Sequence, residues 1–178
     1  MTIQEAVDLI APAASLLPAG HPAHWADLGC GAGLFTSALA RLLPARSTIY
    51  GVDTHPTLRQ QDNPTAIISI RADFIKDPLD LPLLDGILMA NSLHYVKDKP
   101  ALIQKLRTSM HPGAPFILVE YDTDKPVTTW VPYPISYESL KRLFKDHSIQ
   151  KIGVRPSAYG RANMYAALSM PVTPSSPL

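Results

Sequence analysis

The chain has 178 residues, of which 46% are hydrophobic and 17% charged, and its formal net charge is +1. This length suits one domain with a buried core and is short for two ordinary domains. A net charge near zero, without clusters of lysine or arginine, argues against a nucleic-acid partner, and a single cysteine, Cys30, excludes a disulfide within the chain.

Short apolar runs alternate with helical patterns along the chain. The patterns predict helices at residues 2–16, 34–43, 56–61, 98–110 and 136–145. They predict strands at residues 25–28, 48–52, 66–70, 85–90, 115–120, 149–154 and 164–169. Thr2 and Glu5 fit a capping box for the first helix, and Ser136 suits the N-cap of the last.

The alternation of strands and helices predicts an α/β fold with a mostly parallel seven-stranded sheet and helices on both faces. The loop between the last two strands is too short for a crossover helix, so the last strand should be antiparallel. We expect one domain over residues 1–170 and a disordered, Pro- and Ser-rich tail over residues 171–178.

The sequence also lacks the signals of a membrane or secreted protein. The first residues do not form the positive and apolar regions of a signal peptide. No apolar run approaches the roughly 18 residues of a membrane span. We therefore expect a cytoplasmic protein without a membrane partner.

In a parallel sheet of this kind, ligands bind beyond the carboxyl ends of the strands. Residues 27–33 read DLGCGAG and connect the first expected strand to a helix. Glycines let this loop turn tightly and approach a ligand, and the helix directs free N–H groups toward the same space. A dinucleotide fingerprint would need glycine at position 34, where the chain has Leu34. The loop therefore suits a zwitterionic amino-acid tail better than a pyrophosphate.

This loop resembles that of the class I S-adenosylmethionine-dependent methyltransferases, in which an acidic residue precedes the glycines. The resemblance covers roughly residues 25–169 and implies the Rossmann-like methyltransferase fold. It implies that the methionine part of the cofactor S-adenosylmethionine contacts Asp27, Gly29, Gly31 and Gly33. The product formed from this cofactor would be S-adenosylhomocysteine.

Asp53 ends the second expected strand, 20 residues after Gly33. A carboxylate there can accept hydrogen bonds from both hydroxyls of a ribose, and the family carries an acidic residue at this position. An ordinary helix N-cap is the alternative role for Asp53. An NAD-dependent enzyme would use such an acid as well, so Asp53 does not separate these two classes.

The ends of the next two strands complete the expected cofactor site. The resemblance implies that Asp73 accepts from the adenine amino group, that Phe74 lies beside the base, and that the backbone near Asn91 holds the cofactor's ammonium. For Asp73, a solvated loop acid is the alternative. The D/N-P-P-Y/F/W motif of enzymes that methylate nucleic-acid bases is absent, and Cys30 lies in the cofactor loop, which excludes a cysteine nucleophile.

His94 and Tyr95 follow the fourth expected strand, where the resemblance implies that the methyl acceptor approaches, and they are the candidate catalytic residues. A histidine with an unperturbed pKa near 6.5 could remove a proton from the acceptor. A packing role for His94 is the alternative, because methyl transfer gains mainly from proximity and orientation.

Trp130 and Tyr133 lie in a long loop after the fifth strand and are candidates for the wall of an acceptor pocket. Covering the edge of the core is the alternative role for both. His21, His24 and His55 lack the spacing of metal ligands, so we expect no metal site.

We therefore expect a methyltransferase that acts on a small-molecule acceptor. The alternative is a catalytically inactive protein that keeps the methyltransferase fold as a scaffold. An NAD-dependent reductase is disfavoured by Leu34 and by the lack of a Tyr-x-x-x-Lys pair. The identity of the acceptor is not encoded in any motif, and a homo-oligomer is left open.

Overall fold

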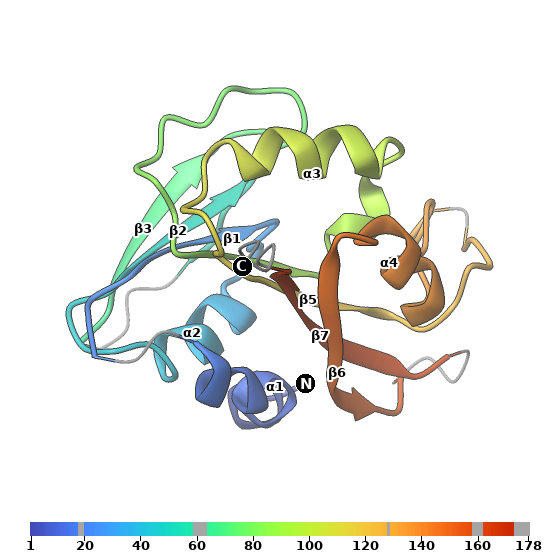
Figure 1. The fold of residues 1–178 in the computed structure, drawn as a ribbon, viewed down its shortest axis with the longest axis horizontal. Coiled ribbons are helices and arrows are strands. Elements are labelled where there is room, and N and C mark those ends of the chain that lie inside the picture. Colours follow the sequence, from blue (N-terminus) through green and yellow to red (C-terminus); the bar gives the residue numbers. More distant parts are fainter. Residues whose placement is uncertain (18–19, 59–63, 128, 158–161, 173–178) are drawn as a thin grey trace, which may run out of the picture.

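A computed structural model describes residues 1–17, 20–58, 64–127, 129–157 and 162–172. Seven strands form one sheet in the order β3-β2-β1-β4-β5-β7-β6 (Figure 1). The strands are β1 (His24–Leu28), β2 (Thr48–Asp53), β3 (Ala66–Arg71), β4 (Gly86–Ala90), β5 (Phe116–Tyr121), β6 (His147–Arg155) and β7 (Met164–Pro171). Neighbours among β1 to β5 are parallel, and β7 is antiparallel to both β5 and β6. The predicted parallel sheet with an antiparallel last strand is confirmed.

The helices are α1 (Ile3–Ile10), α2 (Leu34–Ala40), α3 (Lys99–Arg107) and α4 (Tyr137–Leu143), with 3₁₀-helices η1 (Ala11–Leu16) and η2 (Leu93–Tyr95). Of the four α-helices in the described residues, α1, α3 and α4 begin at a residue whose side chain caps the helix. At α1, Thr2 and Glu5 form the expected capping box. At α4, the Ser136 hydroxyl accepts from the Ser139 backbone N–H. Because proline at position 12 follows α1 closely, the first helix continues only as the tighter 3₁₀ form.

The helix predicted over residues 56–61 is not found in the described part of that range. Residues 56–58 are not helical, and residues 59–61 lie outside the described part of the chain. The tail expected over residues 171–178 overlaps β7, which extends through Pro171. Residues 173–178 lie outside the described residues. Among the residues described, no helix has both the length and the apolar composition needed to cross a membrane.

Helices cover both faces of the sheet, with α3 and α4 on one side and α1 and α2 on the other (Figure 1). Successive residues of the central strands point to opposite sides. In β4, Ile87 belongs to the core under α3 and α4, whereas Leu88 belongs to the core under α1 and α2. In β5, Leu118 and Ile117 divide in the same way. Two buried faces explain why these strands are continuous apolar runs.

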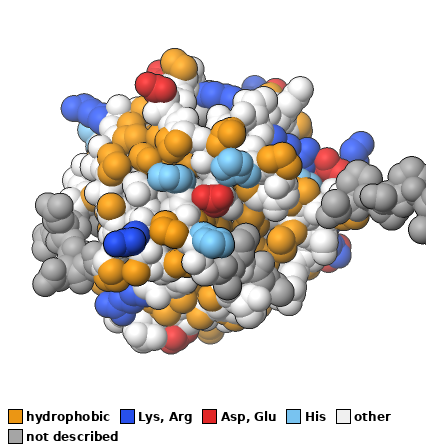
Figure 2. All heavy atoms as spheres, turned by 60° about the vertical axis from the view of Figure 1, so that its left-hand side comes forward, with side chains coloured by type: hydrophobic (Ala, Val, Ile, Leu, Met, Phe, Trp, Pro, Cys, Tyr) orange, Lys and Arg blue, Asp and Glu red, His pale blue; other side chains and the backbone are white. Residues whose placement is uncertain are grey.

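The edge strand β3 is less covered than the centre of the sheet. Four of its six residues are exposed, and Ile68 has 44% of its surface accessible. Figure 2 brings this side of the molecule forward and shows hydrophobic, basic, acidic and histidine side chains interspersed over the face. At the buried centre of the sheet, by contrast, the parallel strands β1, β4 and β5 end at the same edge. The candidate site lies at their carboxyl ends.

Candidate active site

The loop after β1 turns through three glycines in the left-handed region. The φ angles are +81° at Gly29, +52° at Gly31 and +81° at Gly33. Side chains disfavour this backbone conformation because Cβ approaches the following carbonyl. The turn closes with a bond of 2.8 Å from the Gly33 N–H to the carbonyl oxygen of Cys30. The path of the backbone thus explains why positions 29, 31 and 33 of this loop are glycine.

Gly29 also lies against the segment that follows β4. A Cβ atom at Gly29 would be 2.4 Å from Cβ of Ser92, far inside van der Waals contact. The Ser92 hydroxyl donates a hydrogen bond of 2.5 Å to the carbonyl oxygen of Leu28. These contacts join the ends of two strands that are distant in sequence, and they place Asn91 beside the glycine loop.

A cavity of about 190 Å³, here called the loop cavity, lies in front of this loop. It is lined by Met1, Asp27, Gly29, Cys30, Ala32, Leu34, Phe35, Ala90 and Asn91. Asp27 is buried, and its carboxylate accepts a 2.6 Å hydrogen bond from the Thr36 hydroxyl. Burial raises the pKa of Asp27 to about 7 despite this bond. The cavity therefore contains a buried carboxyl group that lacks a cationic partner among the described residues.

Asn91 supplies a second oxygen acceptor at the same place. Its φ of +54° is unusual for a residue with a side chain. Its side-chain oxygen Oδ1 is buried, and no described residue donates a hydrogen bond to it. Buried polar atoms are nearly always bonded. Asn91 and Asp27 together suit a ligand that brings a positively charged hydrogen-bond donor.

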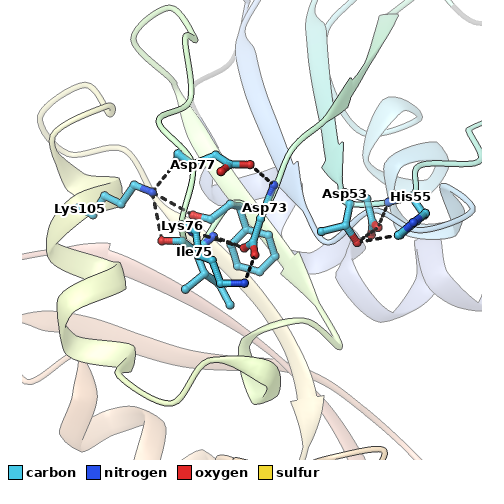
Figure 3. Close-up of polar contacts among 9 residues, drawn as sticks. Asp53, His55, Asp73, Ile75, Lys76, Asp77 and Lys105 are labelled. Carbon is cyan, nitrogen blue, oxygen red and sulfur yellow. Dashed lines mark hydrogen bonds and ion pairs between the residues drawn. The ribbon is translucent and has the colours of Figure 1, made fainter.

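Asp53, at the end of β2, lies next to the glycine loop. One carboxylate oxygen accepts a 2.9 Å bond from the Gly31 N–H, and the other accepts a 2.9 Å bond from the His55 N–H (Figure 3). The bond to the residue two positions later is a local turn contact. A carboxylate has about four acceptor positions, so capacity remains for further donors.

Asp73 follows β3 and is turned away from Asp53 in Figure 3. Its carboxylate lies 2.9 Å from the Lys76 ammonium and accepts a 3.0 Å bond from the Ile75 N–H. The contact with Lys76 lowers the pKa of Asp73. Because the Lys76 side chain is 80% exposed, solvent screens this pair and it contributes little to stability. The structure thus does not bring Asp73 and Asp53 together, although the ion pair that holds Asp73 is weak.

Phe74 and Lys105 stabilise the turn that carries Asp73. The Phe74 ring is buried and lies 3.6 Å from the Cβ position of Gly29. From α3, the Lys105 ammonium donates to the carbonyl oxygens of Phe74 (3.2 Å), Ile75 (3.3 Å) and Asp77 (2.7 Å) (Figure 3). Sequence reasoning gave no role to Lys105, since its partners are backbone atoms about 30 residues away.

A second cavity, of about 510 Å³, lies beyond β4 and β5 and is called the His94 cavity. It is lined by Asn91, His94, Tyr95, Tyr121, Thr123, Val127, Trp130, Val131, Ser157 and Ala162. Asn91 lines both cavities, so the two meet at this residue. Tyr133 is not among the described residues that line this cavity, and its ring lies 5.8 Å from the Lys99 ammonium.

His94 forms a buried pair with Glu120, the penultimate residue of β5. His94 Nδ1 lies 2.6 Å from one carboxylate oxygen, and the His94 backbone N–H donates to the other at 3.1 Å. Since a carboxylate accepts, Nδ1 carries a proton, and in the neutral ring Nε2 then presents a lone pair. No described residue forms a hydrogen bond with Nε2. This geometry orients a histidine to accept a proton from the cavity it lines.

Sequence reasoning missed Glu120. The available signal was an acidic residue at the end of an apolar strand that has both faces covered, because a fully buried carboxylate requires a partner. Glu120 is 0% exposed. Its partner is separated from it by 26 positions, so the pairing itself could not be read from local spacing.

The loop that carries Trp130 and Tyr133 is fixed at its base. The Tyr133 N–H donates to the carbonyl oxygen of His94 at 2.9 Å, and the Lys99 ammonium donates to that of Tyr133 at 2.7 Å. Asp124 accepts from both the backbone and the hydroxyl of Ser136, at 2.9 and 2.7 Å. The loop is therefore bound to η2, α3 and α4, and it forms a stable wall of the His94 cavity.

Two other side chains bear on the chemistry. Burial raises the pKa of the Cys30 thiol to about 12, so the nucleophilic thiolate is not formed near neutral pH. The Tyr95 ring lies 4.4 Å from the His94 ring, centroid to centroid, and is 49% exposed. Among the described residues, no group of three His, Cys, Asp or Glu side chains is placed to hold a metal ion.

Comparison with known proteins identifies the family. The model of the methyltransferase domain family matches residues 3–162. The chain belongs to this family. The 2-phytyl-1,4-naphtoquinone methyltransferase of Nostoc punctiforme is 32% identical over 103 residues, which are 53% of this chain and 45% of that protein. The chain thus matches less than half of the length of this relative.

Solved structures share the fold of this methyltransferase-family chain. The plantazolicin methyltransferase BpumL in complex with SAH aligns with a TM-score of 0.69 and 13% identity, over 96% of this chain and 84% of that one. The N-methyltransferase NodS from Bradyrhizobium japonicum WM9, in complex with S-adenosyl-L-homocysteine, aligns with a TM-score of 0.71 and 16% identity, over 96% and 87%. At these identities the likeness shows the fold, and the predicted Rossmann-like methyltransferase fold is confirmed.

The close approach of Gly29 and Ser92 gives a prediction for this methyltransferase-family chain. Gly29→Ala should lower the free energy of unfolding by more than Gly113→Ala. Both glycines have a φ near +80° (+81° and +85°), but a Cβ at Gly113 meets nothing within 4 Å. The left-handed conformation alone costs about 1–2 kcal/mol, and only Gly29→Ala adds the collision with Ser92. Urea unfolding of both variants measures the difference, and equal losses would contradict the contact.

Proposed function

We propose that this chain transfers a methyl group from S-adenosylmethionine to a small-molecule acceptor and releases S-adenosylhomocysteine. The observation that carries the proposal is the meeting of the loop cavity and the His94 cavity at Asn91. One cavity contains the glycine loop of the family, and the other contains a histidine oriented by a carboxylate. Membership of the methyltransferase family and the likeness to structures with bound S-adenosylhomocysteine support the same reaction.

The loop cavity fits the methionine end of the cofactor. Asp27 and Asn91 would hold its ammonium group, since both present oxygen acceptors that lack a cation. Gly29, Gly31 and Gly33 would let the backbone approach the ligand, because their left-handed turn leaves no side chains in the way. A buried carboxylate without a cationic partner is unfavourable, and the ammonium would supply that partner.

The nucleoside part would lie along the ends of β2 and β3. Asp53 would accept from the ribose hydroxyls with the acceptor capacity that Gly31, Thr54 and His55 leave. Asp73 would accept from the adenine amino group after exchanging its weak contact with Lys76, and Phe74 would support the base from the core side. The exposed ion pair offers little resistance to this exchange.

The residues of the His94 cavity would bind the acceptor and remove its proton. S-adenosylmethionine supplies an electrophilic methyl group on a positively charged sulfur. His94 Nε2 would take the acceptor's proton, and Glu120 would stabilise the resulting imidazolium through Nδ1. Tyr95 and Trp130 would orient the acceptor from the walls of the cavity.

The alternative is a catalytically inactive scaffold that keeps the fold. Such a protein has no need for an open space beside the cofactor site, and Tyr95 or Trp130 could then fill it. Both side chains instead line a cavity of about 510 Å³. This observation supports the enzyme, as does the small-molecule acceptor in the name of the Nostoc relative.

Calorimetric titration with S-adenosylhomocysteine tests the proposal. The protein should bind this product, and Asp53→Ala should weaken binding by roughly 1–3 kcal/mol because charge-assisted hydrogen bonds to the ribose are lost. Asp80→Ala, a change in an exposed loop, should leave binding unchanged. No binding at millimolar ligand would contradict the proposed function. Unchanged affinity in Asp53→Ala alone would remove Asp53 from the site.

Binding should also depend on pH through Asp27. Without ligand, burial raises the pKa of this carboxyl group to about 7, so at lower pH it is protonated and cannot pair with an ammonium. Below pH 7, affinity for S-adenosylhomocysteine should therefore increase about tenfold for each unit by which the pH is raised. Above pH 7 it should stay constant. Calorimetry between pH 5.5 and 8 should show weaker, flatter binding for Asp27→Asn. The same slope in that variant would contradict the role of Asp27.

A further inference from the structure

We propose that the methyl acceptor is an uncharged aromatic compound with a hydroxyl group, bound against Tyr95 and Trp130 with its hydroxyl directed to His94. This inference rests on the proposed function, because it names the class of molecule that the His94 cavity takes. The charge, the hydrogen-bonding groups and the shape of the cavity each lead to one part of this description.

The described part of the cavity wall favours an uncharged acceptor. Among the described residues that line it, none is Lys, Arg, Asp or Glu. The nearest carboxylate, Glu120, is fully buried and is already paired with His94. An ion in this cavity would lose its hydration without gaining a partner. An uncharged molecule avoids this loss.

The polar groups of the cavity require a hydrogen-bond donor. Asn91 Oδ1 is assigned to the cofactor's ammonium, which leaves His94 Nε2 as an acceptor that receives no hydrogen bond from a described residue. A hydroxyl group satisfies this nitrogen, whereas an ether or a ketone leaves it unpaired. The hydroxyl proton passes to Nε2, where the imidazolium is held by Glu120, and the oxygen keeps the electron pair of the broken O–H bond as a nucleophile. This transfer needs no further reactant.

The walls favour a flat ring. Tyr95, Tyr121 and Trp130 contribute aromatic faces, and Val127 and Val131 contribute aliphatic ones. A volume of about 510 Å³ falls within the roughly 300–1,000 Å³ typical of ligand pockets. The cavity therefore has room for a fused two-ring compound.

Trp130 has a position that suits a cover for the acceptor. It lines the cavity, yet 73% of its surface is exposed. It lies in a tight turn in which the Trp130 N–H donates to the carbonyl oxygen of Val127 at 2.9 Å, and Val127 and Val131 are paired. The base of this loop is fixed by Asp124 and Lys99. An aromatic acceptor would bury the exposed indole face by stacking.

Calorimetry with four matched probes tests the inference on protein saturated with S-adenosylhomocysteine. The probes are 2-naphthol, 2-methoxynaphthalene, 2-naphthoate and 2-naphthylmethylammonium, which share the ring and differ in donor and charge. We expect 2-naphthol to bind at least about tenfold more tightly than each of the others, the factor that one lost hydrogen bond of about 1.4 kcal/mol gives. Tightest binding by a charged probe or by the ether, or binding by none, would overturn the inference.

Variants locate the binding. Trp130→Ala should weaken 2-naphthol about two- to tenfold through lost stacking, and Trp130→Phe should restore part of that loss. Leu83→Ala, a change at a side chain that is 51% exposed and is not part of the cavity, should have no effect. Unchanged affinity in Trp130→Ala would overturn the placement of the acceptor. The titration with S-adenosylhomocysteine that precedes the probes separates the two proposals. Failure to bind this ligand contradicts the methyltransferase function, whereas another order of affinities among the four probes contradicts only the acceptor class.

Discussion

The candidate site depends on the close approach of the strand ends of β1 and β4. Only a glycine at position 29 allows the Ser92 side chain to reach the carbonyl oxygen of Leu28. This contact holds the segment after β4 against the glycine loop, and Asn91 consequently borders both cavities. A larger residue at position 29 would separate the two segments and with them the two halves of the site. One steric constraint in the backbone thus sets the geometry in which two molecules can meet.

Two buried carboxylates lie on either side of Asn91, and their different surroundings explain their different roles. Both carboxylate oxygens of Glu120 contact His94, one the ring and the other the backbone N–H, so they have partners within the protein whether or not a ligand is present. Asp27 has only a neutral hydroxyl as its side-chain partner, and burial raises its pKa to about 7. A buried charge without a partner is unfavourable, so the loop cavity favours a cationic ligand. The chain therefore contains one site prepared for a cation and one prepared for a proton.

The features that could be predicted from the sequence are local ones. Hydrophobic periodicity gave the strands, and the glycine spacing with Leu34 separated this loop from a dinucleotide site. The solvated environment of Asp73 was one of two alternatives, but its ion pair with Lys76 was not foreseen, although it spans only three positions. The His94–Glu120 pair and the Ser92–Leu28 bond join residues 26 and 64 positions apart. Such pairs depend on strand order and register, which local patterns do not contain.

The proposed function requires that a bound cofactor present its sulfur to the His94 cavity at Asn91. A crystal structure of the protein with S-adenosylhomocysteine would show whether it does. We expect the ligand's ammonium to lie between Asp27 and Asn91 and its sulfur to open into the cavity lined by His94 and Trp130. A sulfur atom separated from that cavity by protein, or a ligand bound away from the glycine loop, would show that the two cavities do not form one active site.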